Sequence, residues 1–314
     1  MDVDVDLLKK FEDQLNPAYP EQSGIPPKIL GYGEISTTFS IGDMPGTAFK
    51  RMPPFGTMEE INVYKSVVDH YCGLLTDECG IDVPKYAFYE MTNCFNELIL
   101  YVAQHQFPET SIGNYILIHG TGEQLEMMID AVMERLIRIW QRNQERMPDE
   151  LIAIDGQISN WSFQFNDAGG CRTVYFDITT PLYRLTGEEQ LDTEIFLKSC
   201  PSFLVWLVRW QFLQEVLDRY YDMRLVLIDL VANFHKEGRD DRIDATLFLI
   251  NRLLKEKMAA DVIHPLTRQE VDTYYKNDAS IWSLFLRLRR LDRWIKTRVL
   301  GKQYNFMLPA NIKR

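Results

Sequence analysis

The hydrophobic pattern of this chain changes near residue 105, and this change limits the folds that it can adopt. Before that point, short β-type runs lie between turn sequences, and one segment has the apolar spacing that is typical of a helix. The expected strands are 37–41, 47–52, 86–89 and 97–102, and the expected helix is 58–71. The first third of the chain is therefore expected to be rich in β-structure.

After residue 105, helical patterns dominate, and one β-rich island interrupts them. The island, with runs at 161–165 and 172–178, is typical of a hairpin. The expected helices are 124–142 and, roughly, 201–236, 243–258 and 280–300. Because alternating strand and helix units are missing, a doubly wound parallel sheet is excluded. The pattern predicts an α+β chain with a β-rich N-terminal lobe over 1–104 and a mainly helical C-terminal lobe over 105–314.

Composition excludes several classes of protein. The chain has 314 residues, 46% of them hydrophobic, and a formal net charge of −11, which argues against a global basic surface for nucleic acid. Five scattered cysteines without a CxxC pair suggest reduced thiols and a cytoplasmic location. The acidic N-terminus has no hydrophobic signal core, and the densest apolar run, 203–208, is too short to span a bilayer. We expect no transmembrane segment.

Several residues in the first lobe suit a site for phosphate groups. Gly31, Gly33 and Ser36 fall where the first strand would turn into the second, and glycines there let backbone N–H groups approach a phosphate. Lys50 ends the next strand, and Glu59 and Glu60 begin the helix that follows. Each feature alone has an ordinary interpretation: a turn, a solvated lysine, and acids that complement the helix dipole.

The strongest signal lies between the long helix and the hairpin. Asp155, four intervening residues and Asn160 form a loop there, and Asp177 follows an apolar run on the second hairpin strand. Phosphoryl transfer needs carboxylate and amide oxygens for magnesium and a carboxylate that orients the acceptor hydroxyl. An isolated loop with Asp and Asn would be turn chemistry. The order of all these motifs along the chain is what favours a phosphotransferase.

In this order, residues 28–185 resemble the protein-kinase-like superfamily, most closely the aminoglycoside and choline phosphotransferase branch. The resemblance implies a two-lobed fold that binds ATP and Mg²⁺. It implies that Lys50 contacts the phosphates and pairs with Glu60, or failing that Glu59. By the same resemblance, Asp155 is the catalytic base, Asn160 and Asp177 hold magnesium, Gly31, Gly33 and Ser36 cover the phosphates, and the backbone at Tyr101 and Ala103 meets adenine.

The chain also departs from the superfamily pattern. The usual histidine before the catalytic aspartate is Ala153, the third glycine of the nucleotide loop is Ser36, and the glycine after the metal aspartate is Ile178. The Ala-Pro-Glu segment that follows in protein kinases is missing, which favours a small hydroxylated acceptor over a protein. A non-catalytic nucleotide-binding regulator and a nucleotidyl transferase remain the alternatives.

A basic stretch near the C-terminus stands out in an acidic chain. Residues 282–302 hold seven Lys or Arg and one acid, and Leu284, Leu288, Leu291 and Ile295 share one helical face. The first interpretation is a packed terminal helix with a solvated basic face. The alternatives are contact with an anionic membrane surface or with an acidic partner. Because the stretch lies outside the kinase-like segment, we expect it to be dispensable for nucleotide binding.

Overall fold

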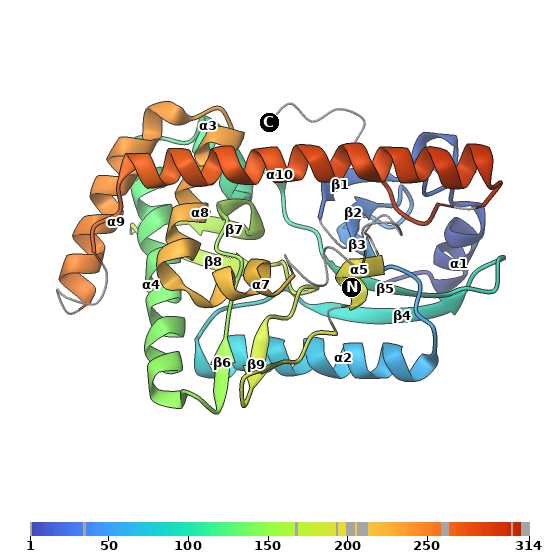
Figure 1. The fold of residues 1–314 in the computed structure, drawn as a ribbon, viewed down its shortest axis with the longest axis horizontal. Coiled ribbons are helices and arrows are strands. Elements are labelled where there is room, and N and C mark those ends of the chain that lie inside the picture. Colours follow the sequence, from blue (N-terminus) through green and yellow to red (C-terminus); the bar gives the residue numbers. More distant parts are fainter. Residues whose placement is uncertain are drawn as a thin grey trace.

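A computed structural model gives the fold of the chain (Figure 1). It describes residues 2–33, 36–166, 169–192, 194–198, 205, 213–258, 264–302 and 304–308. Within these residues, a β-sheet with two helices forms the N-terminal lobe, and helices make up most of the C-terminal lobe. The expected α+β fold, with a β-rich N-terminal lobe and a mainly helical C-terminal lobe, is confirmed.

The N-terminal lobe is built on one antiparallel sheet of five strands. Its order is β1-β2-β3-β5-β4. The strands are β1 (Lys28–Tyr32), β2 (Thr37–Ser40), β3 (Thr47–Arg51), β4 (Tyr86–Thr92) and β5 (Leu98–His105). Helix α2 (Met58–Gly73) packs on one face through Leu100 and Val102, and α1 (Val5–Gln14) packs on the other through Phe49 and Tyr101. β3 lies inside the sheet, so both of its faces are buried.

The C-terminal lobe surrounds the long helix α4 (Gly122–Arg146). The Thr121 side chain accepts from the Gln124 N–H and the Gln124 side chain accepts from the Thr121 N–H, which fixes the start of α4. Hairpin β7–β8 (Trp161–Phe165 and Cys171–Tyr175) packs beside α4. The remaining elements are α3 (Gly113–His119), β6 (Glu150–Ile152), β9 (Tyr183–Leu185), β10 (Glu188–Glu189), α5 (Glu194–Lys198), α7 (Leu213–Tyr221), α8 (Met223–Lys236), α9 (Ile243–Lys257) and α10 (Arg268–Trp294).

Helix α10 links the two lobes. Its first half packs against α8, where His235 Nε2 lies 2.8 Å from Asp272 Oδ1. Its last turns reach the N-terminal lobe, where Arg293 Nη1 donates to the Ala18 carbonyl at 3.1 Å. Figure 1 shows α10 running along one side of the molecule from α9 toward α1. Among the described residues, no helix is apolar over a length sufficient to cross a membrane.

The expected helices differ most from the observed ones in two places. The expected helix 201–236 is divided at Asp222, whose side chain accepts from the Leu225 N–H and starts α8. Its beginning, 201–204 and 206–212, lies outside the described residues. Helix α10 begins at Arg268, well before the expected 280, because Thr267 and Glu270 form a capping box.

The proposed lobe boundary falls beside the end of β5 at His105. The division into 1–104 and 105–314 stays a proposal, because the C-terminal residues return to the first lobe. Met307 packs in the apolar cluster on the α1 side of the sheet, and the Asn305 carbonyl accepts from Arg51.

Candidate functional site

The site begins with an ion pair between the two lobes. Lys50 lies on β3, and its Nζ is 2.7 Å from Asp177 Oδ1, which follows β8. The Lys50 side chain is only 6% exposed, and the same ammonium donates to Thr179 Oγ1 at 3.2 Å and to the Phe176 carbonyl at 3.3 Å. A lysine held this way is not a solvated strand end. The fold therefore joins two of the predicted residues that lie 127 positions apart.

The loop with Asp155 and Asn160 lies beside this pair. Asp155 Oδ1 accepts from the Gln157 N–H at 3.1 Å, and the Asn160 side-chain amide donates to the Asp155 carbonyl at 3.4 Å. The Phe176 N–H donates to the Asn160 carbonyl at 3.0 Å, which extends the pairing of β7 and β8 by one residue on each strand. The loop and the residue before Asp177 are thus joined directly by backbone.

Two glycines explain why this loop packs so closely. A Cβ on Gly156 would lie 2.7 Å from Val226 Cγ1 of α8, and a Cβ on Gly113 at the start of α3 would lie 2.2 Å from the Ile158 carbonyl oxygen. Both distances are shorter than a real carbon contact. The loop is therefore held between α3 and α8 with room for little except glycine at these two positions.

Helix α2 faces the site with tyrosines, which sequence reasoning missed. The buried Tyr64 hydroxyl donates to the Thr179 carbonyl at 2.8 Å, and the buried Tyr71 hydroxyl donates to the Ala153 carbonyl at 2.9 Å. Tyr71 thus supports the backbone of the loop at Ala153, two residues before Asp155. The signal was present, because Tyr64 lies on the apolar face predicted for this helix and its hydroxyl needs a partner there.

The expected pair of Lys50 with Glu60 is wrong in this structure. Glu60 is exposed, accepts from the Gly56 N–H at 3.0 Å and lies 3.4 Å from Lys198 Nζ. The backbone hydrogen bond from Gly56 is the main reason that the pKa of Glu60 is lowered. Glu59 is exposed as well. Both glutamates lie in the first turn of α2, and the buried face points Tyr64 toward the site instead.

The expected adenine contacts at Tyr101 and Ala103 are also misplaced. Both residues lie in the middle of β5, where Tyr101 pairs with Arg51 and Tyr89, and Ala103 pairs with Phe49 and Ala87. The backbone N–H and C=O groups of these residues are therefore used in pairing with β3 on one side and with β4 on the other. Pairing extends to Gln106, whose N–H donates to the Gly46 carbonyl at 2.9 Å. The free linker backbone therefore begins at Phe107, whose ring lies 5.8 Å from that of Phe176.

The predicted glycine turn forms between β1 and β2. The Gly33 N–H donates to the Ser36 carbonyl at 2.9 Å, and Gly31 lies at an irregularity in the β1–β2 pairing. Residues 34 and 35 lie outside the described residues. Gly33 and Ser36 line a hollow together with Arg51 and with Arg289 of α10.

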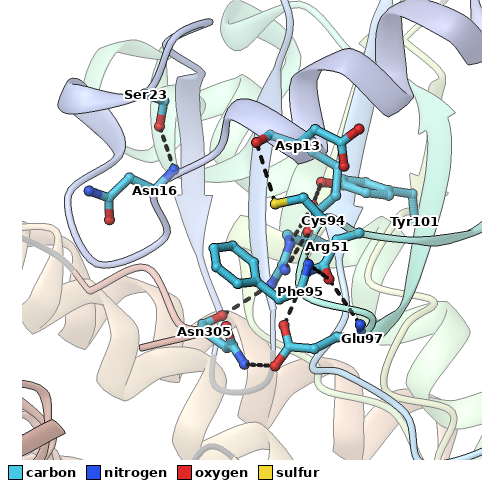
Figure 2. A network of polar contacts seen from close by, with 11 residues as sticks. Asp13, Asn16, Ser23, Arg51, Cys94, Phe95, Glu97, Tyr101 and Asn305 are labelled. Atoms are coloured by element: carbon cyan, nitrogen blue, oxygen red, sulfur yellow. Dashed lines mark hydrogen bonds and ion pairs between the residues drawn. The ribbon is translucent and has the colours of Figure 1, made fainter. Parts of the chain in front are cut away.

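Arg51 anchors both ends of the chain to this part of the sheet (Figure 2). Its guanidinium donates to both oxygens of Glu12 in α1, at 2.8 and 2.7 Å, and to the Asn305 carbonyl at 3.1 Å. The Tyr101 hydroxyl also donates to Glu12. Burial works against the charge on Arg51, but Glu12 outweighs it and raises the pKa of Arg51. Lys50 and Arg51 are adjacent, so they point to opposite faces of the sheet.

A second hollow opens beside the Asp155 loop. Gln157 lines it together with residues of α8 and α10: Asp229, Ala232, Asn233, Lys236, Tyr274, Tyr275 and Asp278. The Gln157 side-chain amide donates to Asp229 Oδ2 at 2.9 Å. Burial is the largest cause that raises the pKa of Asp229, and nearby Asp278 adds to it. The hollow is thus polar and contains both acids and a lysine.

The residues present suit magnesium only with help from a ligand. Among the described residues, no cluster of three or more His, Cys, Asp or Glu side chains is arranged to hold a metal. Asp177 and Asn160 together offer one carboxylate and one amide oxygen. Mg²⁺ commonly takes one or two protein carboxylates and completes its shell with phosphate oxygens and water. The pair therefore fits a metal that arrives with a nucleotide.

Comparisons with known proteins place the chain in a family. A search of curated proteins finds no match. Among solved structures, the chain is similar to one described as "WaaP in complex with acyl carrier protein", with 9% identity, a TM-score of 0.33, and coverage of 81% of this chain and 87% of that one. A likeness at this level assigns no activity. Residues 13–293 match a family model. The chain belongs to this family, which is described as "Family of unknown function (DUF6206)".

Proposed function

We propose that this chain is an ATP- and Mg²⁺-dependent phosphotransferase that acts on a small hydroxylated acceptor. One observation carries the proposal: the ion pair between Lys50 and Asp177, which lies next to the loop of Asp155 and Asn160. A lysine, a carboxylate, an amide and a second carboxylate are the minimal set for phosphoryl transfer. They come from three segments: Lys50 lies on β3, Asp155 and Asn160 lie in the loop before the hairpin, and Asp177 lies after it.

Each residue has a role in this proposal. The Lys50 ammonium would leave Asp177 and bind the nucleotide phosphates, a move that exchanges one anionic partner for another. Asp177 and Asn160 would hold the magnesium ion, which supplies neutralisation of phosphate charge. The turn at Gly31, Gly33 and Ser36 would cover the phosphates through its backbone. Phe107 and the linker after it, in place of the backbone of Tyr101 and Ala103, would lie against the adenine.

Asp155 would orient the acceptor hydroxyl and take its proton. The second hollow suits the acceptor, because Gln157 lies in the Asp155 loop and also lines that hollow. Its polar lining from Asp229, Lys236 and Asn233 offers hydrogen-bond donors and acceptors to a molecule with several hydroxyl groups. We therefore place the acceptor between the loop, α8 and α10.

The test is turnover of ATP that carries separate labels on the α and γ phosphates, with and without magnesium, over a panel of small polyhydroxylated acceptors. Transfer of the γ label that requires magnesium supports the proposal. Transfer of the α label would instead show a nucleotidyl transferase. Magnesium-dependent binding of ATP without transfer of either label would show a non-catalytic regulator. Ala153 and the position of Glu60, which contacts Lys198 and not Lys50, favour that alternative. The matched control is Lys50→Met, which keeps an unbranched apolar side chain at the buried position and removes the ammonium group.

A further inference from the structure

The outer face of α10 carries apolar side chains that no part of the described chain covers. Leu284, Leu291 and Trp294 are 58%, 46% and 56% exposed. Ile281 lies exposed before them, and Val299 and Leu300 continue the exposed row after the helix. Large apolar side chains at successive turns of one helix face form a contiguous patch, and such patches mark interaction surfaces.

The rotation of the helix is fixed by its buried side, which is unexpectedly polar. Arg289 and Asp292 are each 4% exposed, and Leu286 is buried as well. The Arg289 guanidinium stacks between the rings of Phe285 and Phe306, at 5.5 and 5.2 Å from their centres. Together with the bond from Arg293 to Ala18, these contacts turn Arg289 and Arg293 toward the protein. The expected packed leucine face is therefore wrong, because Leu284 and Leu291 are exposed, and the expected solvated basic face holds for Arg287 and not for Arg289.

Charge on the outer face has one sign. Arg287, Arg298 and Lys302 are exposed among the apolar side chains, and Arg290 is half-buried at the edge. The single acid of residues 279–302 is Asp292, which is buried and lies 2.9 Å from Lys296. A positive, apolar strip thus lies on a protein with a formal net charge of −11.

We propose that this strip, the outer face of 281–302, binds the surface of an anionic lipid bilayer. Leucine and tryptophan side chains insert at the boundary of headgroups and acyl chains, and arginine and lysine pair with anionic headgroups. Helix α10, lying flat, can present Leu284, Leu291 and Trp294 to one plane, and the exposed Arg298, Val299 and Leu300 follow directly after it. A second copy of the chain would bring like charges together in a symmetric contact, which disfavours self-association.

The test is co-sedimentation of the whole chain with phosphatidylcholine vesicles that contain or lack phosphatidylserine. We expect binding that needs phosphatidylserine and weakens as salt is raised. Leu291→Gln with Trp294→Gln, and separately Arg287→Glu with Arg298→Glu, should each lower the partition coefficient by about tenfold or more. The matched controls are Phe248→Gln, on an exposed residue of α9, and Arg252→Glu on the same helix. They should bind as the original chain does.

Three results would overturn the proposal: no sedimentation with either vesicle, equal sedimentation with both, or a dimer in solution that the Leu291→Gln and Trp294→Gln changes dissociate. The last would assign the strip to a second copy. The strip variants change exposed side chains only, so thermal unfolding of each variant should match that of the original chain and separates loss of binding from loss of fold. Nucleotide turnover does not enter this test, so the two proposals fail independently.

Discussion

Lys50 and Asp177 form an ion pair in the structure. Mutations of Asp177 and of Asp155 should have different effects and so distinguish the roles proposed for the two aspartates. In Asp177→Asn, the buried ammonium loses its carboxylate, so we expect lower stability as well as weaker magnesium-dependent nucleotide binding. Because a quarter of the Asp177 side chain is exposed, the cost should stay below the roughly 3–5 kcal/mol of a fully buried pair. Denaturant unfolding and calorimetry with Mg-ATP measure the two effects.

Asp155→Asn should give the opposite pattern. Asp155 is proposed to touch the acceptor and not the nucleotide, so binding should be nearly unchanged while turnover falls by roughly 10²–10⁴. Asp43→Asn, on an exposed residue of the β2–β3 turn, is the control and should change neither quantity. If Asp155→Asn abolishes nucleotide binding and Asp177→Asn spares it, the two roles are exchanged.

Tyr64, and not Glu60, is the α2 side chain that contacts a partner of Lys50, because its hydroxyl donates to the Thr179 carbonyl. Tyr64→Phe leaves the buried Thr179 carbonyl without its donor, so we expect a loss of about 1 kcal/mol in stability and slower turnover through the displaced Thr179 hydroxyl. Glu60→Gln removes the negative charge that meets Lys198 and the Gly56 N–H at an exposed position, and it should change stability by no more than about 1 kcal/mol. A larger effect of Glu60→Gln on turnover would show that the helix rotates when nucleotide binds.

At the scale of elements, the sequence predicts where helices and strands occur better than which way they face. Periodicity gave α2, α4, β3 and β5 within a few residues, because their apolar faces are regular. It could not orient α10, since a helix with apolar side chains on one face and arginine on another presents two possible inner faces. The choice depends on Phe306 and Ala18, which are distant in sequence and contact the arginine side.

This orientation changes what we expect of the basic helix. Arg289 is buried, its Nε has no hydrogen-bond partner in the described chain, and it lines the same hollow as Gly33 and Ser36. Arg289→Gln should therefore lower the stability of the glycine turn and weaken nucleotide binding, contrary to the sequence expectation that the helix is dispensable. The control is Arg287→Gln, which changes an exposed arginine on the outer face of the same helix. Equal affinity for Mg-ATP in both variants would restore the sequence expectation.

At the scale of the whole molecule, residues near both ends of the sequence bind to the same strand, β3. Glu12 near the N-terminus and Asn305 near the C-terminus both bond to Arg51, which follows the lysine of the candidate site on β3. Figure 2 shows Arg51 and Asn305 in this network. No local pattern predicts this closure, because it depends on α10 crossing from one lobe to the other. We infer that the lobes unfold together, since α10 and residues 304–308 contribute to the burial of both.

Buried tyrosines make this cooperative unfolding sensitive to alkaline pH. Burial raises the pKa of Tyr64, Tyr71, Tyr101 and Tyr175 well above the ordinary value of 10.0. Unfolded tyrosines would ionise near that ordinary value, so above it the folded chain retains more protons than the unfolded one. Stability is therefore fully present below about pH 10 and falls as pH rises, by up to about 1.4 kcal/mol per pH unit for each tyrosine.

We expect denaturant midpoints to fall steeply between about pH 10 and 11.5, with tyrosinate absorbance appearing only together with the loss of circular dichroism. Tyr64→Phe with Tyr71→Phe removes two of the buried hydroxyls that the folded chain keeps protonated. The double variant is less stable at neutral pH because two hydroxyl donors are lost, but its stability should decline less steeply with pH. Tyrosinate that forms in the folded chain near pH 10 with no loss of stability would show that these hydroxyls are open to solvent.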